Sequence, residues 1–301
     1  MTFDSISFLN EYKTAHKINK GFSHDEKWVI DDRYLLRIFG DVSSEQLEEQ
    51  ALLIQKAVNN GASIPNVHEL GMYQSKPYMI LDYLQGKNAE EVLPVMSGQE
   101  QYQAGLDTGR GLQKLHASPV DQPVASWESK WNKRVYRLAP DFESIFKNSP
   151  RHLKVLDFIY DQLYLMKDRP QRIQHYDFHP SNVIFNNNRF EGIIDMQKIK
   201  LADPYHELYK TEYFTLPISV SFARGIFDGY HDGSVPADFW KLHRLYAAIH
   251  IVSAEVWAHN VAIDQKETFR RYTERTLNEW DDFQLDIPKW YTAGHSEGEN
   301  I

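Results

Sequence analysis

Asp177, Asn182 and Asp195 are the residues of this chain whose types and spacing best suit a chemical reaction. They lie in one stretch, from His175 to Asp195, with the sequence HYDFHPSNVIFNNNRFEGIID. A carboxylate can accept the proton of a hydroxyl group, and a carboxylate beside an amide oxygen can hold Mg²⁺ through hard oxygen ligands. A base next to two metal ligands is the set of groups that phosphoryl transfer requires.

The elements around these residues are expected to form a hairpin. Val183–Phe185 and Arg189–Ile194 are strand-like, and Asn186-Asn187-Asn188 between them favours a turn because Asn tolerates positive φ. Neighbouring antiparallel strands lie about 5 Å apart. Asn182 and Asp195 should therefore emerge side by side at the open end of the hairpin, with the base upstream on the loop.

A second chemistry fits part of the same stretch. His175 and His179 are four residues apart and could bind zinc from one face of a helix, as in a metal-dependent hydrolase. Pro180 follows His179 directly and disfavours a continuous helix. The hydrolase is therefore the weaker hypothesis, and we expect the two histidines to brace the loop.

The eight residues from His175 to Asn182 resemble the H-x-D-x-H-x-x-N catalytic loop of aminoglycoside phosphotransferases and their choline-kinase-like relatives. In the corresponding protein-kinase loop, Asp is the base and Asn binds metal. Ile193-Ile194-Asp195 resembles the strand that ends in the metal-binding Asp of this family. Met196-Gln197 stands where protein kinases have Phe-Gly, and Asp203-Pro204 is similar to a pattern of the small-molecule branch.

The resemblance implies an α+β, protein-kinase-like bilobal fold with a small β-rich N-lobe and a larger, mainly helical C-lobe. It also implies a Mg²⁺-dependent enzyme that moves the γ-phosphoryl group of ATP or GTP to a hydroxyl group of a small molecule. Asp177 would be the catalytic base, and Asn182 and Asp195 would hold the metal.

The same resemblance assigns a phosphate-binding cation in the N-terminal part. Arg37, in the strand Tyr34–Phe39, occupies the position where kinases commonly carry a Lys for the α- and β-phosphates. Arginine is always charged and can bind phosphate through two hydrogen bonds, so the replacement is chemically sound. Glu49 would orient Arg37, with Glu48 as the alternative.

Other N-terminal residues would contact the rest of the nucleotide. Ser23 lies in the segment 20–25, which would cover the phosphates. Asp82 and Leu84 lie near the end of an apolar strand, and their backbone would bind the purine at the hinge between the lobes.

The hydrophobic pattern predicts the elements that this fold needs. Strands are expected at Lys27–Ile30, Tyr34–Phe39, Val67–Met72 and Pro77–Leu84, and a helix begins at Ser43 with a capping box and ends at Asn59-Asn60-Gly61. From about Glu90 onward, helical periodicity dominates. We therefore expect an N-lobe over residues 1–85 and a C-lobe over residues 86–301, with 291–301 as a frayed tail.

Composition limits the function classes further. The chain has 301 residues, of which 42% are hydrophobic, and no cysteine, which excludes disulfides, thiolate zinc sites and cysteine nucleophiles. The net charge of −9 argues against nucleic acid or an anionic membrane as the main partner. No secretory signal or membrane-spanning segment is visible, so we expect a cytoplasmic protein.

The acceptor follows least from the sequence. A net charge of −9 suits a cationic acceptor, and the leading expectation is an aminoglycoside or another antibiotic or amino sugar. A metabolic kinase for choline, amino alcohols or sugars and a non-catalytic nucleotide-binding pseudokinase are the alternatives. A protein kinase is disfavoured because the loop lacks the Arg-Asp pair. Acidic and aromatic residues that could line the acceptor pocket are Glu207, Glu212, Tyr213, Asp228, Glu255, Trp257, Trp280, Asp281 and Asp282.

Overall fold

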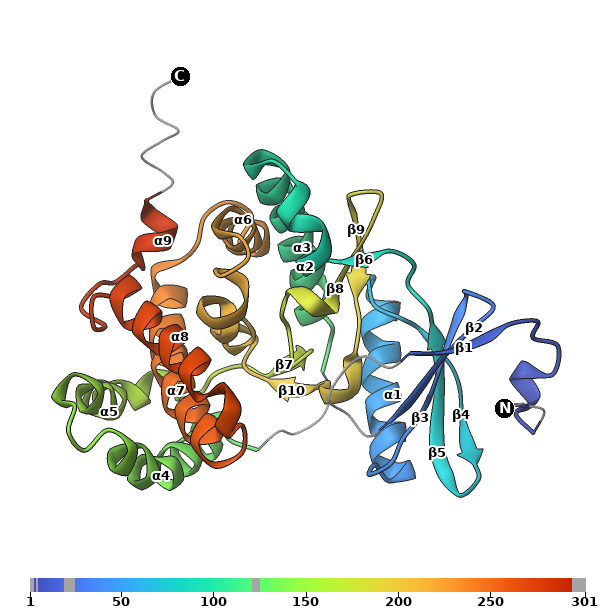
Figure 1. Cartoon of the computed structure of the whole chain (residues 1–301), viewed down its shortest axis with the longest axis horizontal. Helices are drawn as coiled ribbons and strands as arrows, with labels where there is room; N and C mark the ends of the chain where they lie inside the picture. Colours follow the sequence, from blue (N-terminus) through green and yellow to red (C-terminus); the bar gives the residue numbers. More distant parts are fainter. Residues whose placement is uncertain (1–2, 4, 19–24, 121–124, 294–301) are drawn as a thin grey trace.

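The computed structural model describes residues 3, 5–18, 25–120 and 125–293. A small sheet formed by the N-terminal residues lies at one end of the molecule, and a larger helical part fills the other end (Figure 1). The expected combination of a β-rich part followed by a helical part is confirmed. The predicted boundary between residues 85 and 86 lies in the connection between the two parts, and the division of the chain there stays a prediction.

The N-terminal sheet has five antiparallel strands in the order β1-β2-β3-β5-β4. Their bounds are β1 Ala15–Ile18, β2 Glu26–Ile30, β3 Tyr34–Ile38, β4 Val67–Tyr73 and β5 Lys76–Asp82. The four predicted strands are confirmed, whereas β1 was missed because its four residues show no alternation of apolar and polar types. Asp31 and Asp32 both have φ of 51°, the left-handed geometry that suits the tight turn of a twisted hairpin.

Helix α1, Ser44–Asn59, packs between this sheet and the rest of the molecule (Figure 1). The predicted capping box is present: the Gln46 N–H donates to Ser43 Oγ over 3.3 Å, and the Ser43 N–H donates to Gln46 Oε1 over 3.1 Å. Gly61 follows the helix with φ of 83°, where a side chain would be strained.

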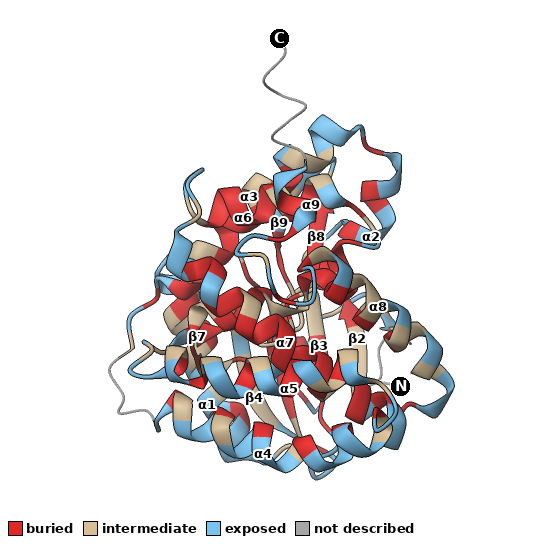
Figure 2. Ribbon diagram, turned by 90° about the vertical axis from the view of Figure 1, so that its left-hand side faces the viewer, coloured by how far each residue is buried: buried red, intermediate tan, exposed pale blue. Residues whose placement is uncertain are grey.

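The helical part is built around α7, Ala237–Asn260, which is buried along most of its length (Figure 2). A helix that is apolar on nearly every side belongs in the middle of a core, and α7 contacts α4, α5 and α8. The other helices are α2 Ala89–Val92, α3 Gly98–His116, α4 Trp127–Ile145, α5 Pro150–Gln162, α6 Val220–Tyr230, α8 Lys266–Glu279 and α9 Lys289–Thr292.

Helices α3 and α6 touch through their backbones. A Cβ atom on Gly105 would lie 2.3 Å from the carbonyl oxygen of Phe222, and one on Gly225 would lie 2.2 Å from that of Tyr102. Only glycine allows this approach. Strand β9 packs against α3 of this pair.

Short strands flank the loop from His175 to Asn182. The predicted hairpin is confirmed as β8, Val183–Asn186, and β9, Arg189–Ile193, with Asn187 and Asn188 at positive φ. Strand β6, Lys87–Asn88, extends this sheet, and β7, Arg172–Gln174, pairs with β10, Lys200–Ala202. The loop therefore begins at one small sheet and ends in another. No helix of the described residues is long and apolar enough to cross a bilayer.

Candidate active site

The loop between β7 and β8 is clamped by the buried ring of His175. Its Nε2 atom lies 2.7 Å from the carbonyl oxygen of Ile194, and its Nδ1 atom accepts the N–H of Asp177 over 3.1 Å. A carbonyl can only accept and a backbone N–H can only donate, so the ring carries its proton on Nε2. The expectation that His175 braces the loop is confirmed.

The carboxylate of Glu207 holds the same loop at a second point. Tyr176 has φ of 67°, and its N–H donates to both carboxylate oxygens of Glu207, at 2.9 and 3.1 Å. Glu207 is buried, and one of its carboxylate oxygens lies 3.5 Å from Nε2 of His116. Positive φ is unfavourable for tyrosine, so the hydrogen bonds to the buried Glu207 carboxylate stabilise this turn. The turn sets the direction of the next residue, Asp177.

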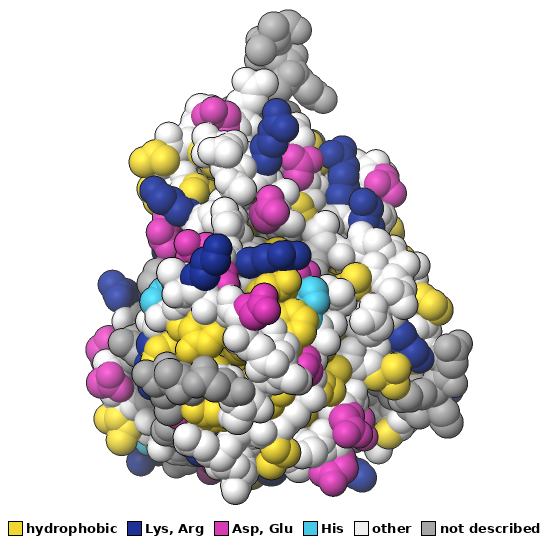
Figure 3. Space-filling model, turned by 90° about the vertical axis from the view of Figure 1, so that its right-hand side faces the viewer, with side chains coloured by type: hydrophobic (Ala, Val, Ile, Leu, Met, Phe, Trp, Pro, Cys, Tyr) yellow, Lys and Arg dark blue, Asp and Glu magenta, His cyan; other side chains and the backbone are white. Residues whose placement is uncertain are grey.

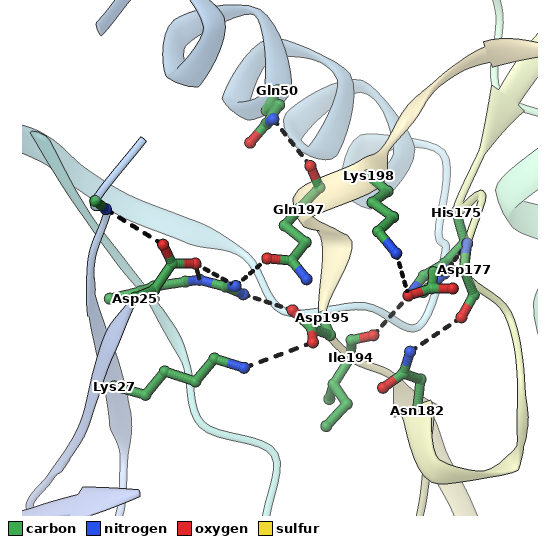
Figure 4. Close-up of polar contacts among 12 residues, drawn as sticks. Asp25, Lys27, Gln50, His175, Asp177, Asn182, Ile194, Asp195, Gln197 and Lys198 are labelled. Atoms are coloured by element: carbon green, nitrogen blue, oxygen red, sulfur yellow. Dashed lines mark hydrogen bonds and ion pairs between the residues drawn. The ribbon is translucent and has the colours of Figure 1, made fainter. Parts of the chain in front are cut away.

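That next residue, Asp177, has its carboxylate in contact with two ammonium groups, and Figure 4 shows the one that belongs to Lys198. Lys198 Nζ lies 2.9 Å from Oδ2, and Lys210 Nζ contacts Oδ1. Burial alone would raise the pKa of Asp177, but the charges and hydrogen bonds of Lys210 and Lys198 outweigh it and hold that pKa far below its usual range. Asp177 is therefore ionised at every physiological pH.

Asn182 and Asp195 lie side by side, as the hairpin geometry predicts. The Ile194 N–H donates to the Asn182 carbonyl oxygen over 2.9 Å, which fixes the two chains next to each other. The Asn182 amide nitrogen donates to the Asp177 carbonyl oxygen over 3.0 Å, so its amide oxygen points the other way (Figure 4). Asp195 follows at φ of 67°.

The donors at this position suit Mg²⁺. Burial raises the pKa of Asp195, yet the neighbouring Arg37 and Lys27 more than reverse this effect and keep its carboxylate ionised. An ionised carboxylate and an amide oxygen are hard ligands. No group of three or more His, Asp or Glu side chains forms a metal site among the described residues, so phosphate oxygens and water would complete the coordination shell.

Arg37 enters the same site from strand β3 and is almost fully buried. Its guanidinium lies 2.5 Å from Asp195, 2.6 and 2.9 Å from Asp25, and in contact with the side chain of Gln197. Lys27, directly opposite Arg37 in the sheet register, reaches the second oxygen of Asp195 at 3.6 Å. Two cations from the N-terminal sheet thus meet the carboxylate at the end of the hairpin (Figure 4).

The predicted ion pair between Arg37 and Glu49 is wrong. Glu49 is exposed, and no ion pair joins it to Arg37 in the described part of the chain. The buried side of α1 runs through Leu47, Ile54 and Ala57, and Gln50 lies on it. Gln50 Nε2 donates to the Gln197 carbonyl oxygen over 2.9 Å. Each helical residue turns the chain by about 100°, so Glu49 points away while Gln50 faces the site.

At the hinge, hydrogen-bonding groups of Asp82 are already used by neighbouring residues of the sheet. The Asp82 carboxylate accepts the Asn66 N–H over 3.0 Å and contacts His68 at 2.7 Å, while its own N–H donates to the Asn66 carbonyl oxygen. Leu84 lies beside Gly192, where an added Cβ would come within 2.7 Å of its side chain. Ser23 lies outside the described residues.

Residues 14–246 match the family described as the phosphotransferase enzyme family, APH. The chain belongs to this family. It is a small-molecule phosphotransferase, which confirms the resemblance and the enzyme class inferred from the loop. No curated protein matches the sequence significantly.

Solved structures share the fold of this phosphotransferase at low identity. A mutant aminoglycoside 2'-phosphotransferase-IIIa in complex with GDP has a TM-score of 0.69 at 16% identity, covering 94% of this chain and 97% of that one. A choline/ethanolamine kinase family protein from Mesorhizobium loti has a TM-score of 0.66 at 16% identity, covering 98% and 97%. The streptomycin–ATP complex of APH(2")-IIa has a TM-score of 0.63 at 17% identity, covering 96% and 97%. The predicted kinase-like fold is confirmed.

Most acidic residues expected around the acceptor lie inside this phosphotransferase, where they brace the helices. Glu207 holds the loop between β7 and β8, and Asp228 accepts hydrogen bonds from the hydroxyl groups of Tyr102 at 2.7 Å and Tyr291 at 2.5 Å. Glu212 pairs with His243, and Glu255 pairs with Arg270. The rings of Tyr213 and Trp280 are core, while Trp257, Asp281 and Asp282 are exposed. A buried carboxylate whose oxygens accept hydrogen bonds from neighbouring groups is not available to a ligand. Glu212 differs from the others in that its Oε2 atom has no hydrogen-bond partner among the described residues.

The residue pattern did not indicate the charged site residues Asp25, Lys27, Lys198 and Lys210, nor the site glutamines Gln50 and Gln197. Lys27 could have been found, because pairing the two predicted strands with Ile30 opposite Tyr34 places Lys27 opposite Arg37. Lys210 carried no local signal, since it lies 33 residues after Asp177 and reaches it from a separate 3-10 helix, Pro204–Lys210.

Asp203, in the Asp203-Pro204 pair noted in the sequence, anchors that 3-10 helix. Its buried carboxylate accepts Arg169 at 2.8 and 3.0 Å, the Tyr246 hydroxyl at 2.6 Å and the Tyr205 N–H at 3.1 Å. Four hydrogen bonds hold this carboxylate firmly in position. Asp203 thereby fixes the direction of the following 3-10 helix, which carries Glu207 and Lys210.

Proposed function

We propose that this phosphotransferase moves the γ-phosphoryl group of ATP or GTP to a hydroxyl group of a small molecule, in a Mg²⁺-dependent reaction. The observation that carries the proposal is the ionised carboxylate of Asp177 on the loop that also presents the amide oxygen of Asn182, with Asp195 beside it. These groups supply a proton acceptor and two metal ligands within one rigid unit.

The reaction is a direct in-line displacement. The acceptor oxygen forms a bond to the γ-phosphorus as the bond from that phosphorus to the β,γ-bridging oxygen breaks, and the nucleoside diphosphate leaves with that oxygen. Asp177 aligns the acceptor hydroxyl and takes its proton late, because a carboxylate with such a low pKa is a weak base toward an undissociated alcohol. Lys198 and Lys210 keep the Asp177 carboxylate in place until the acceptor binds.

Arg37 and Lys27 would bind the α- and β-phosphates. Both already point at Asp195, so phosphates and carboxylate would share the same two cations. Asn182 and Asp195 would hold Mg²⁺, which neutralises charge on phosphate oxygens when it is bound. Ser23 stays a proposed phosphate contact.

The base of the nucleotide would bind at the hinge after β5. Because the Asp82 N–H is used by Asn66, Asp82 can offer only its carbonyl oxygen, and the backbone of Leu84 would supply the second contact. Similar folds have been solved with GDP and with ATP, which supports both nucleotides as candidates.

Two classes of acceptor are candidates. Amino-sugar antibiotics follow from the resemblance, and streptomycin, gentamicin and kanamycin occur in complexes of similar folds. A metabolic acceptor is the second class, and one observation favours it: the two groups in contact with the Asp177 carboxylate are lysines. Such surroundings repel a polycation that must bring its hydroxyl to Asp177.

The test is nucleotide consumption with Mg²⁺ across aminoglycosides, macrolides, choline, amino sugars and simple sugars, with ATP and GTP separately. Acceptor-dependent turnover that disappears in Asp177→Asn is the expected result. Tight nucleotide binding with no turnover for any acceptor would favour a pseudokinase. Absence of nucleotide binding would refute the proposal.

A further inference from the structure

The surroundings of Tyr176 are strongly basic. Five cationic side chains gather there: Lys130 and Arg134 on α4, Lys198, Lys200 on β10 and Lys210. We call this set the basic cluster. The described carboxylates that act on it are Asp177 and the buried Glu207. By contrast, cationic and acidic side chains are interspersed on the N-terminal end of the molecule (Figure 3). The cluster is therefore a local feature of a chain whose net charge is −9.

Contacts between rings connect this cluster to the catalytic loop. Arg134 lies over the ring of Trp131 at 5.2 Å, and Trp131 packs on His206 at 4.7 Å between ring centroids. His206 stacks on Tyr176 at 5.4 Å, and Lys200 Nζ lies 2.9 Å from the centroid of the same tyrosine ring. Tyr176 directly precedes Asp177, so these cations surround the neighbour of the proposed base, while Lys198 and Lys210 contact the base itself.

Within the basic cluster, Lys200 is the cation whose charge is least well compensated. Its side chain is half-buried, and in the described residues it forms no ion pair with a carboxylate, and neither do Lys130 and Arg134. Burial, then Lys130 and Arg134, lower the pKa of Lys200 to about 7. Placing a half-buried ammonium group among other cations is unfavourable unless a ligand compensates it.

We propose that the acceptor of this enzyme carries an anionic group, a carboxylate or a phosphate ester, which Lys200 and Arg134 bind while the hydroxyl group faces Asp177. The inference rests on the proposed phosphoryl transfer and specifies its substrate class. Lys198 and Lys210 contact Asp177 itself and act at the reacting end. Lys200, on the face of Tyr176, and Arg134, on α4, act at the other end of the acceptor.

Anion binding is tested directly with saturating Mg-ADP, so that the nucleotide site is filled. Glucose 6-phosphate, glucuronate, glucose and glucosamine present similar rings with different charges, and calorimetry measures their affinities. We expect the two anions to bind at least about tenfold more tightly than glucose, and glucosamine to bind most weakly. Whether phosphate or carboxylate is preferred distinguishes the two anionic classes. Equal or tighter binding of glucosamine, or no binding of either anion, would overturn the inference.

Variants locate the effect. Lys200→Met and Arg134→Met keep the apolar stem and remove one charge, and each should weaken anion binding about tenfold while Mg-ADP affinity stays unchanged. Lys154→Met, an exposed lysine on α5, is the matched control and should change neither affinity. Anion binding that persists in both variants would refute the assignment to this cluster.

Turnover separates this inference from the proposed function. If no acceptor consumes nucleotide and Mg-ADP does not bind, phosphoryl transfer itself fails. If nucleotide is consumed but cationic acceptors have the higher kcat/KM, phosphoryl transfer stands and the anionic acceptor is rejected.

Discussion

The guanidinium of Arg37 lies 2.5 Å from the carboxylate of Asp195, 158 residues further along the chain. This contact joins the N-terminal sheet to the hairpin that carries the proposed metal ligand. It also means that nucleotide phosphates would have to share Arg37 with a carboxylate. The Arg37 guanidinium can exchange Asp195 for a phosphate group because it has several N–H donors and contacts two carboxylates. During the exchange Asp25 continues to compensate part of the charge of Arg37.

Removal of Asp195 tests this arrangement. Asp195→Ala should abolish Mg²⁺-dependent nucleotide binding, measured by calorimetry with Mg-ATP and with ATP in EDTA, because one of two protein metal ligands is lost. Glu49→Ala is the control, since Glu49 is exposed and should leave affinity unchanged. Unaltered Mg-ATP affinity in Asp195→Ala would rule out its role as a ligand.

Replacement of the proposed base separates chemistry from binding. Asp177→Asn keeps the shape of the side chain but cannot take a proton, so kcat should fall by about 10²–10⁴-fold. Nucleotide affinity should stay close to that of the wild type, because the Asp177 carboxylate contacts lysines of the acceptor side. A variant that retains wild-type turnover would exclude Asp177 as the base.

The pH dependence of stability reports on Lys200. Its pKa is lowered from 10.5 to about 7 by burial, then by Lys130 and Arg134, while Glu207 acts in the opposite direction. Between pH 7 and 10.5 the unfolded chain therefore binds a proton that the folded chain does not, and this term makes stability increase with pH in that window.

Lys200→Met should remove this increase, which denaturant unfolding at pH 6.5, 8 and 9.5 would measure. Lys154→Met should keep the wild-type slope. Anion affinity should also fall as the pH rises through 7, since Lys200 then loses its charge. The same pH slope in wild type and Lys200→Met would contradict the assignment.

The contact between α3 and α6 gives a prediction for stability. Gly105→Ala would place a Cβ atom 2.3 Å from the Phe222 carbonyl oxygen, so the two helices would have to separate, at a cost of about 1–3 kcal/mol. Gly98→Ala, in the same helix, meets its nearest atom at 3.7 Å and should be neutral or slightly stabilising. Thermal unfolding compares the two, and equal stability would show that the helices can adjust.

Local patterns accounted for much of the fold. The capping box at Ser43, the turn at Asp31-Asp32 and the hairpin between Asn182 and Asp195 were predicted and are present. Each depends on residues within a few positions of one another, where turn chemistry and apolar periodicity leave little choice. The relation of Asn182 and Asp195 belongs to the same class, because one hairpin places both, whereas Asp177 lies upstream on a loop that His175 and Glu207 hold.

Contacts between distant segments could not be obtained in this way. Two carboxylates, either of which could have oriented Arg37, occur next to each other on α1, and only the packing of that helix turned both away and brought Gln50 to the site. Lys210 meets Asp177 because the buried Asp203 sets the course of the chain between them. Residue types alone therefore identify the phosphoryl-transfer chemistry. The basic cluster that would select the acceptor forms only when α4, β10 and the 3-10 helix Pro204–Lys210 pack around Tyr176, since no local pattern specifies distances between separate elements.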